Sequence, residues 1–404
     1  MNEILSVGLI LMSALVAGHL AQLARAPEVI GYLLVGLAIG PTALDLVSHR
    51  DVETLGFLSE VTLGVILFSI GSIFEAGTFR KVGRQVVRIT LFEAFGAFLL
   101  VSAGLLVVGQ PLPVAVLLGV VAMETAPATT LMILHEYDAR GPMTDRLLAL
   151  IALNNMLVLV AYGLVAAGLT LALGEGAFLA ALWRAGHGLV WSTAGSVALG
   201  ILVGLLIDLW AARARESGEG IILTMGAVLV VVGAARALHL SPLFATLALG
   251  ATVANTSHHG ERLLKGLGQV DPPLYAAFFV LAGAQLELGR LGTLGLAGLL
   301  YVVLRTIGKV VGASLGIRGQ DVPEQVRRNL GFCLISSSSL AVGLSLQVRA
   351  SFPDLAPPVT AVALSAVIVF EIAGPLLARR ALFAAGEAKT TPRPLEELPE
   401  EVAG

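Results

Sequence analysis

Long apolar runs recur along this sequence, and they constrain its fold more than any other feature. Many are near the length that crosses about 30 Å of hydrocarbon. Hydrophobic residues make up 56% of the 404 residues and charged residues only 13%, whereas a soluble domain carries about 25% charged residues. Such a chain has too little polar surface to face water on all sides. We therefore expect an all-α polytopic membrane protein.

About thirteen transmembrane helices are predicted, but Gly and Pro split or shorten several runs, so counts of twelve and fourteen stay open. The predicted spans are 4–23, 28–46, 55–74, 86–108, 112–134, 146–173, 188–211, 219–237, 241–256, 273–286, 291–316, 329–347 and 358–383. The distribution of Lys and Arg among the loops tests this count, because cytoplasmic loops carry an excess of these residues. With the N-terminus outside, and with the span-end residues Arg146, Arg379 and Arg380 counted with the adjoining inner segments, these segments hold 17 of the 25 Lys and Arg, the outer segments four and the spans four. This bias supports the count and predicts a cytoplasmic C-terminus.

Charge and composition exclude several other classes of protein. The net charge of −3 gives no support for a nucleic-acid partner. The single cysteine, Cys333, rules out a disulfide framework within the chain and a multi-cysteine metal site. The sequence has no glycine-rich nucleotide-binding motif, so no cofactor is expected. Residues 1–386 are predicted to form a transmembrane transporter domain, and the Pro- and Glu-rich residues 387–404 a disordered cytoplasmic tail.

Two trios of spans, 86–173 and 291–383, have the same organisation. The second trio starts an odd number of spans after the first, so the two are predicted to be inverted repeats. Their middle spans contain helix-weakening residues, ETAPATT at 124–130 and four serines at 336–339, because Pro removes a backbone donor and Ser competes for backbone partners. Paired interrupted helices predict a transport site at the membrane midplane. Small-residue packing faces are the alternative interpretation.

Ionisable side chains inside predicted spans are candidates for that site. Arg305 and Lys309 lie four residues apart and share a helix face, where two cations require counter-anions. Glu124 directly precedes the interruption of its span, and for Glu124 and Lys309 a role in transport and a static counter-ion role both stay open. Arg305 is expected to be structural, because arginine does not deprotonate in use. Glu371 is expected to brace its helix pair, and Glu93 to face water near a span end.

Two adjacent asparagines, Asn154 and Asn155, lie within the apolar run 146–173. Their amides carry donors and acceptors whose burial in hydrocarbon is costly unless they find partners. Because this run neighbours one of the interrupted spans, we expect both asparagines to line the site.

A series of short motifs, in this order, resembles the monovalent cation:proton antiporter superfamily, in the branch of bacterial sodium/proton and potassium-efflux antiporters. The resemblance covers nearly the whole chain. Its motifs are EVIGYLLVGLAIGP at 28–41, LFSIG at 67–71, ETAPA at 124–128, EYDARGPMTD at 136–145, FFVLAG at 278–283, RTIGK at 305–309 and EIAGP at 371–375.

The resemblance implies a transporter and no enzyme. It implies a core domain with two crossed, broken helices, a dimerisation domain from the early spans, a homodimer in a bacterial inner membrane, and elevator-like alternating access. In the family, the position of Asn154-Asn155 reads Asn-Asp or Asp-Asp. The second residue binds Na+, K+ or protons in competition, and an aspartate at the first pairs with a lysine matching Lys309. This sequence lacks both carboxylates, and an amide does not titrate near neutral pH.

Three hypotheses follow. In the first, Na+ or K+ is exchanged for protons at an atypical site, where burial moves the pKa of Glu124 toward the range in which proton and cation compete. The expected ion-binding residues are Glu124, Thr125, Thr129, Asn154, Asn155, Ser337 and Ser338. In the second, Arg305 and Lys309 hold an anion or small organic acid. In the third and weakest, the chain is a sensor or membrane partner.

Overall fold

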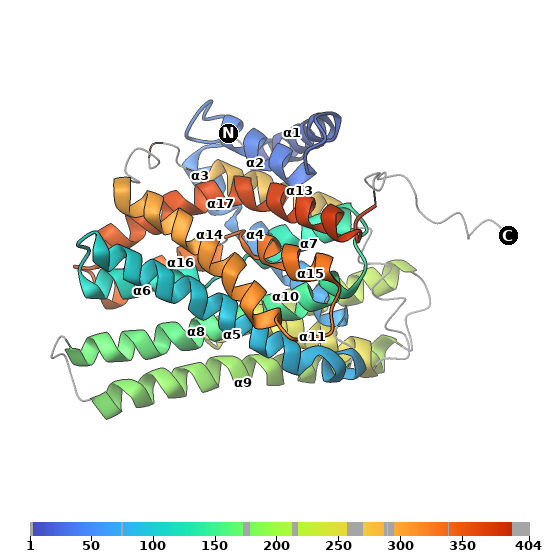
Figure 1. Cartoon of the computed structure of the whole chain (residues 1–404). Coiled ribbons are helices and arrows are strands. Elements are labelled where there is room, and N and C mark those ends of the chain that lie inside the picture. The colour runs from blue at the N-terminus through green and yellow to red at the C-terminus, as the bar shows by residue number, and fades with distance from the viewer. Residues whose placement is uncertain are drawn as a thin grey trace.

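The computed structural model describes residues 3–73, 76–172, 178–211, 217–256, 270–286, 289, 295–337 and 339–389. Within these ranges the chain folds into helices joined by short connections and contains no strand (Figure 1). The expected all-α membrane architecture is therefore confirmed. Each of the thirteen predicted spans coincides with a helix or with a pair of shorter helices.

Eight stretches of the described residues are long and apolar enough to cross a membrane. They lie in α1 (Glu3–Leu23), α5 (Ala76–Val107), α6 with α7 (Leu112–Ala122 and Pro127–Glu136), α8 (Pro142–Ala172), α9 (Phe178–Ala211), α10 (Ser217–Ala237), α14 (Gly295–Ile317) and α17 (Ala356–Ala385). The remaining elements are α2 (Glu28–Ile39), α3 (His49–Thr54), α4 (Gly56–Ile73), α11 (Pro242–Thr256), α13 (Asp271–Ala284), α15 (Glu324–Asn329), η2 (Leu330–Leu334) and α16 (Ser339–Ser351). Helix length alone therefore supports eight crossings, and the count of thirteen stays a prediction.

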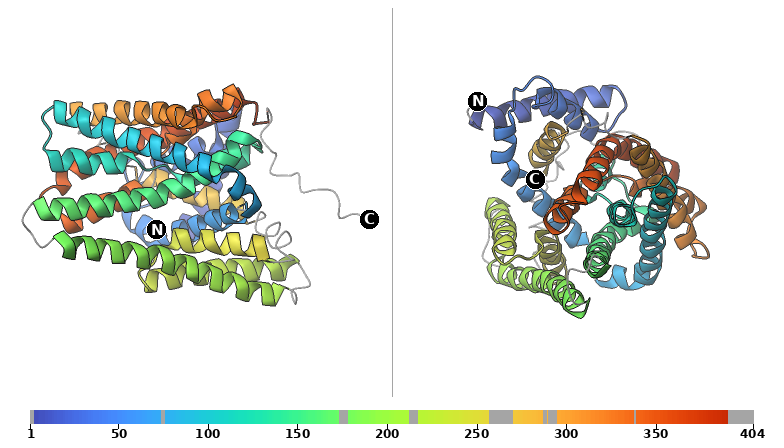
Figure 2. Two further views of the ribbon diagram at one scale, coloured as in Figure 1. Left: turned by 60° about the horizontal axis from the view of Figure 1, so that its bottom comes forward. Right: turned by 90° about the vertical axis from the view of Figure 1, so that its left-hand side faces the viewer.

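The helices form two groups that lie side by side (Figure 2). Helices α5–α8 and α14–α17 pack around one another, and we call this group the core bundle. Helices α1–α4, α9–α11 and α13 form a flanking layer, in which α2 packs on α13 and α11 packs on both α4 and α9. The core bundle unites the two predicted trios, although they are far apart in sequence.

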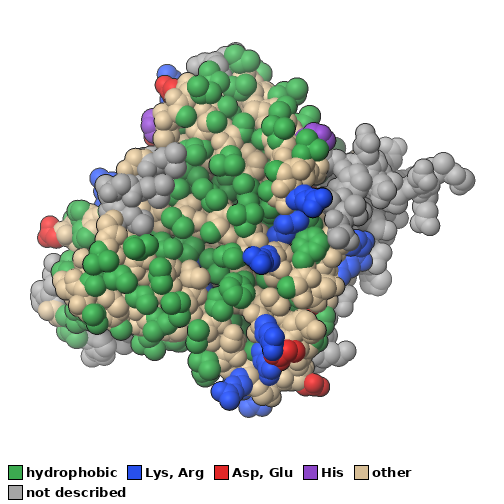
Figure 3. Space-filling view, turned by 45° about the horizontal axis from the view of Figure 1, so that its top comes forward, with side chains coloured by type: hydrophobic (Ala, Val, Ile, Leu, Met, Phe, Trp, Pro, Cys, Tyr) green, Lys and Arg blue, Asp and Glu red, His purple; other side chains and the backbone are tan. Residues whose placement is uncertain are grey.

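The outer surface suits contact with lipid. Large apolar side chains such as Leu99 of α5, Leu202 of α9 and Leu299 of α14 are exposed. Figure 3 shows a face where hydrophobic side chains cover broad areas, while Lys and Arg gather toward one side. Burying such apolar surface in hydrocarbon instead of water is favourable, so the bilayer serves as the solvent for these helices.

Glycines hold α5 and α14 in close contact. A Cβ atom at Gly308 would stand 2.6 Å from the Cα atom of Ala97, and one at Gly312 would stand 2.7 Å from the Cα atom of Glu93. Gly316 approaches Ile89 in the same way. In these contacts the residue number increases along α14 while it decreases along α5. The first helices of the two trios therefore run antiparallel, as inverted repeats require. Small residues at such a seam let helix backbones approach closely in a membrane.

Both middle spans are interrupted, as predicted. Helix α6 ends at Ala122 and α7 begins at Pro127, while η2 ends at Leu334 and α16 begins at Ser339. The two breaks cross, since the backbone N–H of Ala126 donates to the carbonyl oxygen of Ser336 at 3.0 Å. We call this meeting point the crossover. Ser338, an expected ion ligand, lies outside the described residues.

The chain turns back after α17 and contacts the start of α8. The Glu387 carboxylate accepts hydrogen bonds from the backbone N–H groups of Met143 and Thr144, at 2.6 and 2.8 Å, and from the Thr144 hydroxyl at 2.9 Å. Lys389 pairs with Asp138 and holds the pKa of that carboxyl below its usual range. The first three residues of the predicted disordered tail, 387–389, thus have defined contacts, and the rest of 387–404 lies outside the described residues.

Substitution of a glycine in the α5–α14 contact is expected to destabilise the protein, whereas substitution of a glycine that faces open space is not. Gly312→Val is expected to force α5 and α14 apart, because the new side chain would overlap the backbone of Phe92 and Glu93. The melting temperature of the purified protein should fall. Gly233→Ala in α10 is the matched control, since its Cβ atom would meet open space and alanine favours a helix by up to about 1 kcal/mol. Equal melting temperatures for the two variants would contradict the seam.

Candidate functional site: the helix crossover

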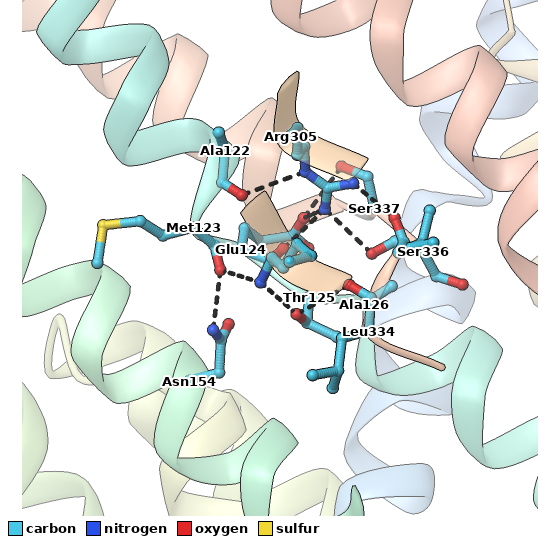
Figure 4. Close-up of polar contacts among 12 residues, drawn as sticks. Ala122, Met123, Glu124, Thr125, Ala126, Asn154, Arg305, Leu334, Ser336 and Ser337 are labelled. Atoms are coloured by element: carbon cyan, nitrogen blue, oxygen red, sulfur yellow. Dashed lines mark hydrogen bonds and ion pairs between the residues drawn. The ribbon is translucent and has the colours of Figure 1, made fainter. Parts of the chain in front are cut away.

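Arg305 of α14 binds the backbone of both breaks (Figure 4). Its Nε donates to the carbonyl oxygen of Ala122 at 3.2 Å, and its Nη2 donates to that of Glu124 at 2.7 Å. From the other break it reaches the carbonyl oxygens of Ile335 at 2.5 Å and Ser336 at 3.3 Å. These carbonyls lack helical partners because the chain leaves its helices there. One guanidinium therefore ties the two interrupted spans together.

The Arg305 side chain is fully buried and has two further contacts. Its Nη2 lies 3.7 Å from Oε2 of Glu124, and its guanidinium lies 4.1 Å from the centre of the Phe370 ring. The Glu124 carboxylate, also fully buried, accepts a hydrogen bond of 3.0 Å from the Ser337 hydroxyl. Glu124 thus lies at the crossover, as expected, with Arg305 beside it as counter-ion.

Lys309, one turn further along α14, contacts the first break. Its Nζ donates to the carbonyl oxygen of Met123 at 2.5 Å and to the Thr125 hydroxyl at 2.7 Å. It also forms an ion pair of 2.7 Å with Oε2 of Glu93. The Asn154 amide donates to Oε1 of Glu93 at 2.6 Å and to the Met123 carbonyl at 2.8 Å. Arg305 and Lys309, on one face of α14, therefore both contact the first break. Arg305 binds the carbonyl oxygens of Ala122 and Glu124, and Lys309 binds the carbonyl oxygen of Met123 and the Thr125 hydroxyl.

Glu93 was expected to face water, and that expectation is wrong. The residue lies in the middle of α5, which begins ten residues before the predicted span 86–108, and its side chain is fully buried. The sequence did contain one indication that Glu93 is buried, because Lys309 requires a counter-anion within the membrane.

Glu371 and Thr129 lie on the α17 side of the crossover. The Thr129 hydroxyl, in the first turn of α7, donates to Oε2 of Glu371 at 3.4 Å. Both residues are buried. Their contact connects α17 with the break that carries Glu124.

The two asparagines differ. The amide nitrogen of Asn154 belongs to the network around Glu93, whereas Asn155 is buried outside that network. Among the described residues, Oδ1 of neither asparagine has a hydrogen-bond partner. Of the expected site residues, Glu124, Thr125, Asn154 and Ser337 are brought together with Arg305 and Lys309, Thr129 contacts Glu371, and Asn155 joins neither set. The described residues contain no cluster of His, Cys, Asp and Glu suited to a metal ion.

Interrupted, crossed helices with buried charges at the breaks define a secondary transporter. The sequence profile described as "Sodium/hydrogen exchanger, transmembrane" matches residues 10–381. The chain belongs to this sodium/hydrogen exchanger family, within the monovalent cation:proton antiporters, and is a transporter, not an enzyme.

Several curated proteins are similar to the chain. The ammonium/H+ antiporter subunit AmhT of Alkalihalophilus pseudofirmus is 24% identical over 87% of this chain and 84% of its own length. The iron transporter MagA of Paramagnetospirillum magneticum is 25% identical over 70% of this chain and 64% of its own length. The glutathione-regulated potassium-efflux protein KefC of Salmonella newport is 26% identical over 92% of this chain. The match spans 60% of KefC.

The fold is that of a solved antiporter. The sodium/proton antiporter MjNhaP1 of Methanocaldococcus jannaschii, in its structure at pH 8, is similar with a TM-score of 0.70. The match covers 96% of this chain and 99% of that one at 19% identity. An electron-microscopy structure of MjNhaP1 gives a TM-score of 0.75.

The buried Glu93–Lys309 pair predicts strong coupling between the two residues. Glu93→Gln or Lys309→Met alone should lower the free energy of unfolding by about 3–5 kcal/mol, because each leaves a buried charge without its partner. The double variant should lose clearly less than the sum of the two. A double-mutant cycle on the purified protein in detergent measures this coupling. Additive effects, or single variants as stable as the wild type, would show that the pair contributes nothing.

Proposed function

We propose that this chain exchanges a monovalent cation, Na+ or K+, for protons by alternating access, with the crossover as its ion site. One observation carries the proposal. Three carboxylates at the crossover, of Glu93, Glu124 and Glu371, lie buried with two bases, Arg305 and Lys309. When all are ionised, one negative charge is left over.

An uncompensated charge in a buried site is costly. One proton or one monovalent cation removes that charge, and the two compete for the same position. Such competition is the basis of antiport, because a site that must hold one of the two carries a cation in one direction and a proton in the other. The crossover therefore has the charge balance that cation:proton exchange requires.

The available ligands also suit an alkali cation. Carboxylate, hydroxyl and amide oxygens are hard ligands, which favour hard cations. The buried oxygen atoms of Glu124, Thr125, Ser337, Asn154 and Asn155 supply these types at or near the breaks. In this proposal Asn155 contributes a neutral oxygen where relatives of the family carry a titrating carboxylate.

Anion transport, the alternative, has weaker support. Arg305 and Lys309 are already occupied by backbone carbonyls and by Glu124 and Glu93. An anion would add to a site that already has a surplus of negative charge. The names of two relatives, an ammonium/H+ antiporter subunit and a potassium-efflux protein, also point to cations.

The proposal includes an assembly and an orientation. Exposed apolar side chains on α1, including Ile4, Met12 and Leu15, offer a surface through which the flanking layer would join two copies as a homodimer. The excess of Lys and Arg in alternate predicted loops supports an orientation with the N-terminus outside and the C-terminus in the cytoplasm, and we propose a bacterial inner membrane as the location.

Proton flux in proteoliposomes tests the function. With a preset pH gradient, added Na+ or K+ is expected to dissipate the gradient through the wild-type protein, while replacing chloride by gluconate at constant cation should have no effect. Protein-free vesicles serve as the control. A flux that follows the anion and ignores the cation would favour the alternative, and proton flux independent of both ions would refute exchange.

Asn155→Asp provides a second test of the charge balance. The new carboxylate would raise the surplus at the crossover to two negative charges, so more than one positive charge would have to bind. We expect more protons moved for each cation, and thus a flux that responds to membrane potential more steeply than the wild type. Asn255→Asp, at an exposed position of α11, is the control. An unchanged response for Asn155→Asp would show that position 155 lies outside the ion site.

A further inference from the structure

Glu371 differs from the other two crossover carboxylates in its partners. Glu93 has Lys309 at 2.7 Å, and Glu124 has Arg305 at 3.7 Å. In the part of the chain that the structure describes, no Lys or Arg forms an ion pair with Glu371. The surplus negative charge of the crossover is therefore concentrated on Glu371.

One hydroxyl group contacts this carboxylate, and a second packs against α17 three residues further along the helix. Thr129 donates to Oε2 of Glu371 at 3.4 Å. Ser336 packs on α17 at Gly374, where a Cβ atom would stand 2.8 Å from the Cα atom of Ser336 and would overlap its hydroxyl. Gly374 follows Glu371 by three residues, so both lie on the same face of α17.

The Ser336 hydroxyl is the second, independent observation. Ser336 is 1% exposed, and its Oγ has no hydrogen-bond partner among the described residues. A buried hydroxyl without a partner is costly. A cation bound between Glu371 and Ser336 would remove that cost, because it would coordinate the Oγ atom.

Helix α7 adds a favourable field. Thr129 is in the first turn of this ten-residue helix, whose N-terminus carries partial positive charge. The helix N-terminus therefore contributes partial positive charge near Glu371 without a full counter-charge. A fixed lysine or arginine would block a cation from this carboxylate, and a helix N-terminus leaves room for one.

We infer that Glu371 is the carboxylate that binds the transported cation and the proton in turn, with the hydroxyls of Thr129 and Ser336 as neutral ligands. This assignment rests on the proposed exchange function and goes beyond it. It changes the role of Glu124 from one of the ion ligands named above to a fixed counter-ion of Arg305. In the exchange step, the protonated Glu371 releases its proton to water and takes up one monovalent cation, so charge is conserved at the site.

Variants of Glu371 test the assignment by cation-dependent proton flux in proteoliposomes. Glu371→Gln is expected to lower the exchange rate at least tenfold and to abolish the rise in melting temperature that Na+ or K+ gives the wild type by mass action. Glu371→Asp keeps the titrating group at a shifted position. It should therefore retain exchange with a displaced pH profile, a change that a bracing role would not produce.

A pair of neighbouring threonines supplies a matched control. Thr129→Val removes the hydroxyl that contacts Glu371 and should raise the cation concentration for half-maximal exchange about 5- to 30-fold. Thr130→Val removes a hydroxyl that donates to the carbonyl oxygens of Ala126 and Cys333 inside the fold, and should leave that concentration unchanged. This pair decides the question even if Glu371→Gln fails to fold.

The outcomes separate this assignment from the proposed function. If the wild type exchanges cations for protons and Glu371→Gln does so at the same rate, the assignment is wrong while the function stands. Equal effects of Thr129→Val and Thr130→Val would also overturn it. If the wild type itself shows no cation-dependent flux, both the function and the assignment fail.

Discussion

Backbone groups freed at a helix break must find partners within the protein, because the hydrocarbon of a membrane offers none. At the crossover this demand is met by Arg305 and Lys309, which donate to carbonyl oxygens that the breaks leave without helical partners. Two buried bases in turn require buried carboxylates. The interruption of two helices thus determines the charges of the site, and a site with one carboxylate more than it has bases is suited to exchange a cation for a proton.

The position of these bases depends on packing far from the ion itself. Glycines of α14 let its backbone approach that of α5, so that Lys309 meets Glu93 across the seam. A larger residue at Gly312 would separate the two helices and draw the lysine away from the break. The small residues of the seam and the charged residues of the crossover therefore form one arrangement, in which neither part has its geometry without the other.

Much of this could be predicted from sequence where the signal is local. The lengths of the apolar runs predicted the helices, and Pro127 and the serine run predicted the two helix breaks. The spacing of Arg305 and Lys309 predicted that both lie on one face of their helix. The partner of Lys309 could not be predicted, because it depends on how two helices more than 200 residues apart are rotated and packed. The different environments of Asn154 and Asn155 have a similar cause. Successive residues of a helix point about 100° apart, so only one of the pair reaches Glu93.

The return of the chain after α17 has a mechanical consequence. Glu387 holds the first residues of α8, so the helix that carries Glu371 is fastened at its far end to the helix that carries Asn154. The Glu387 carboxylate therefore links the C-terminal end of α17 to the N-terminal end of α8, so a displacement of one helix end is transmitted to the other through these hydrogen bonds.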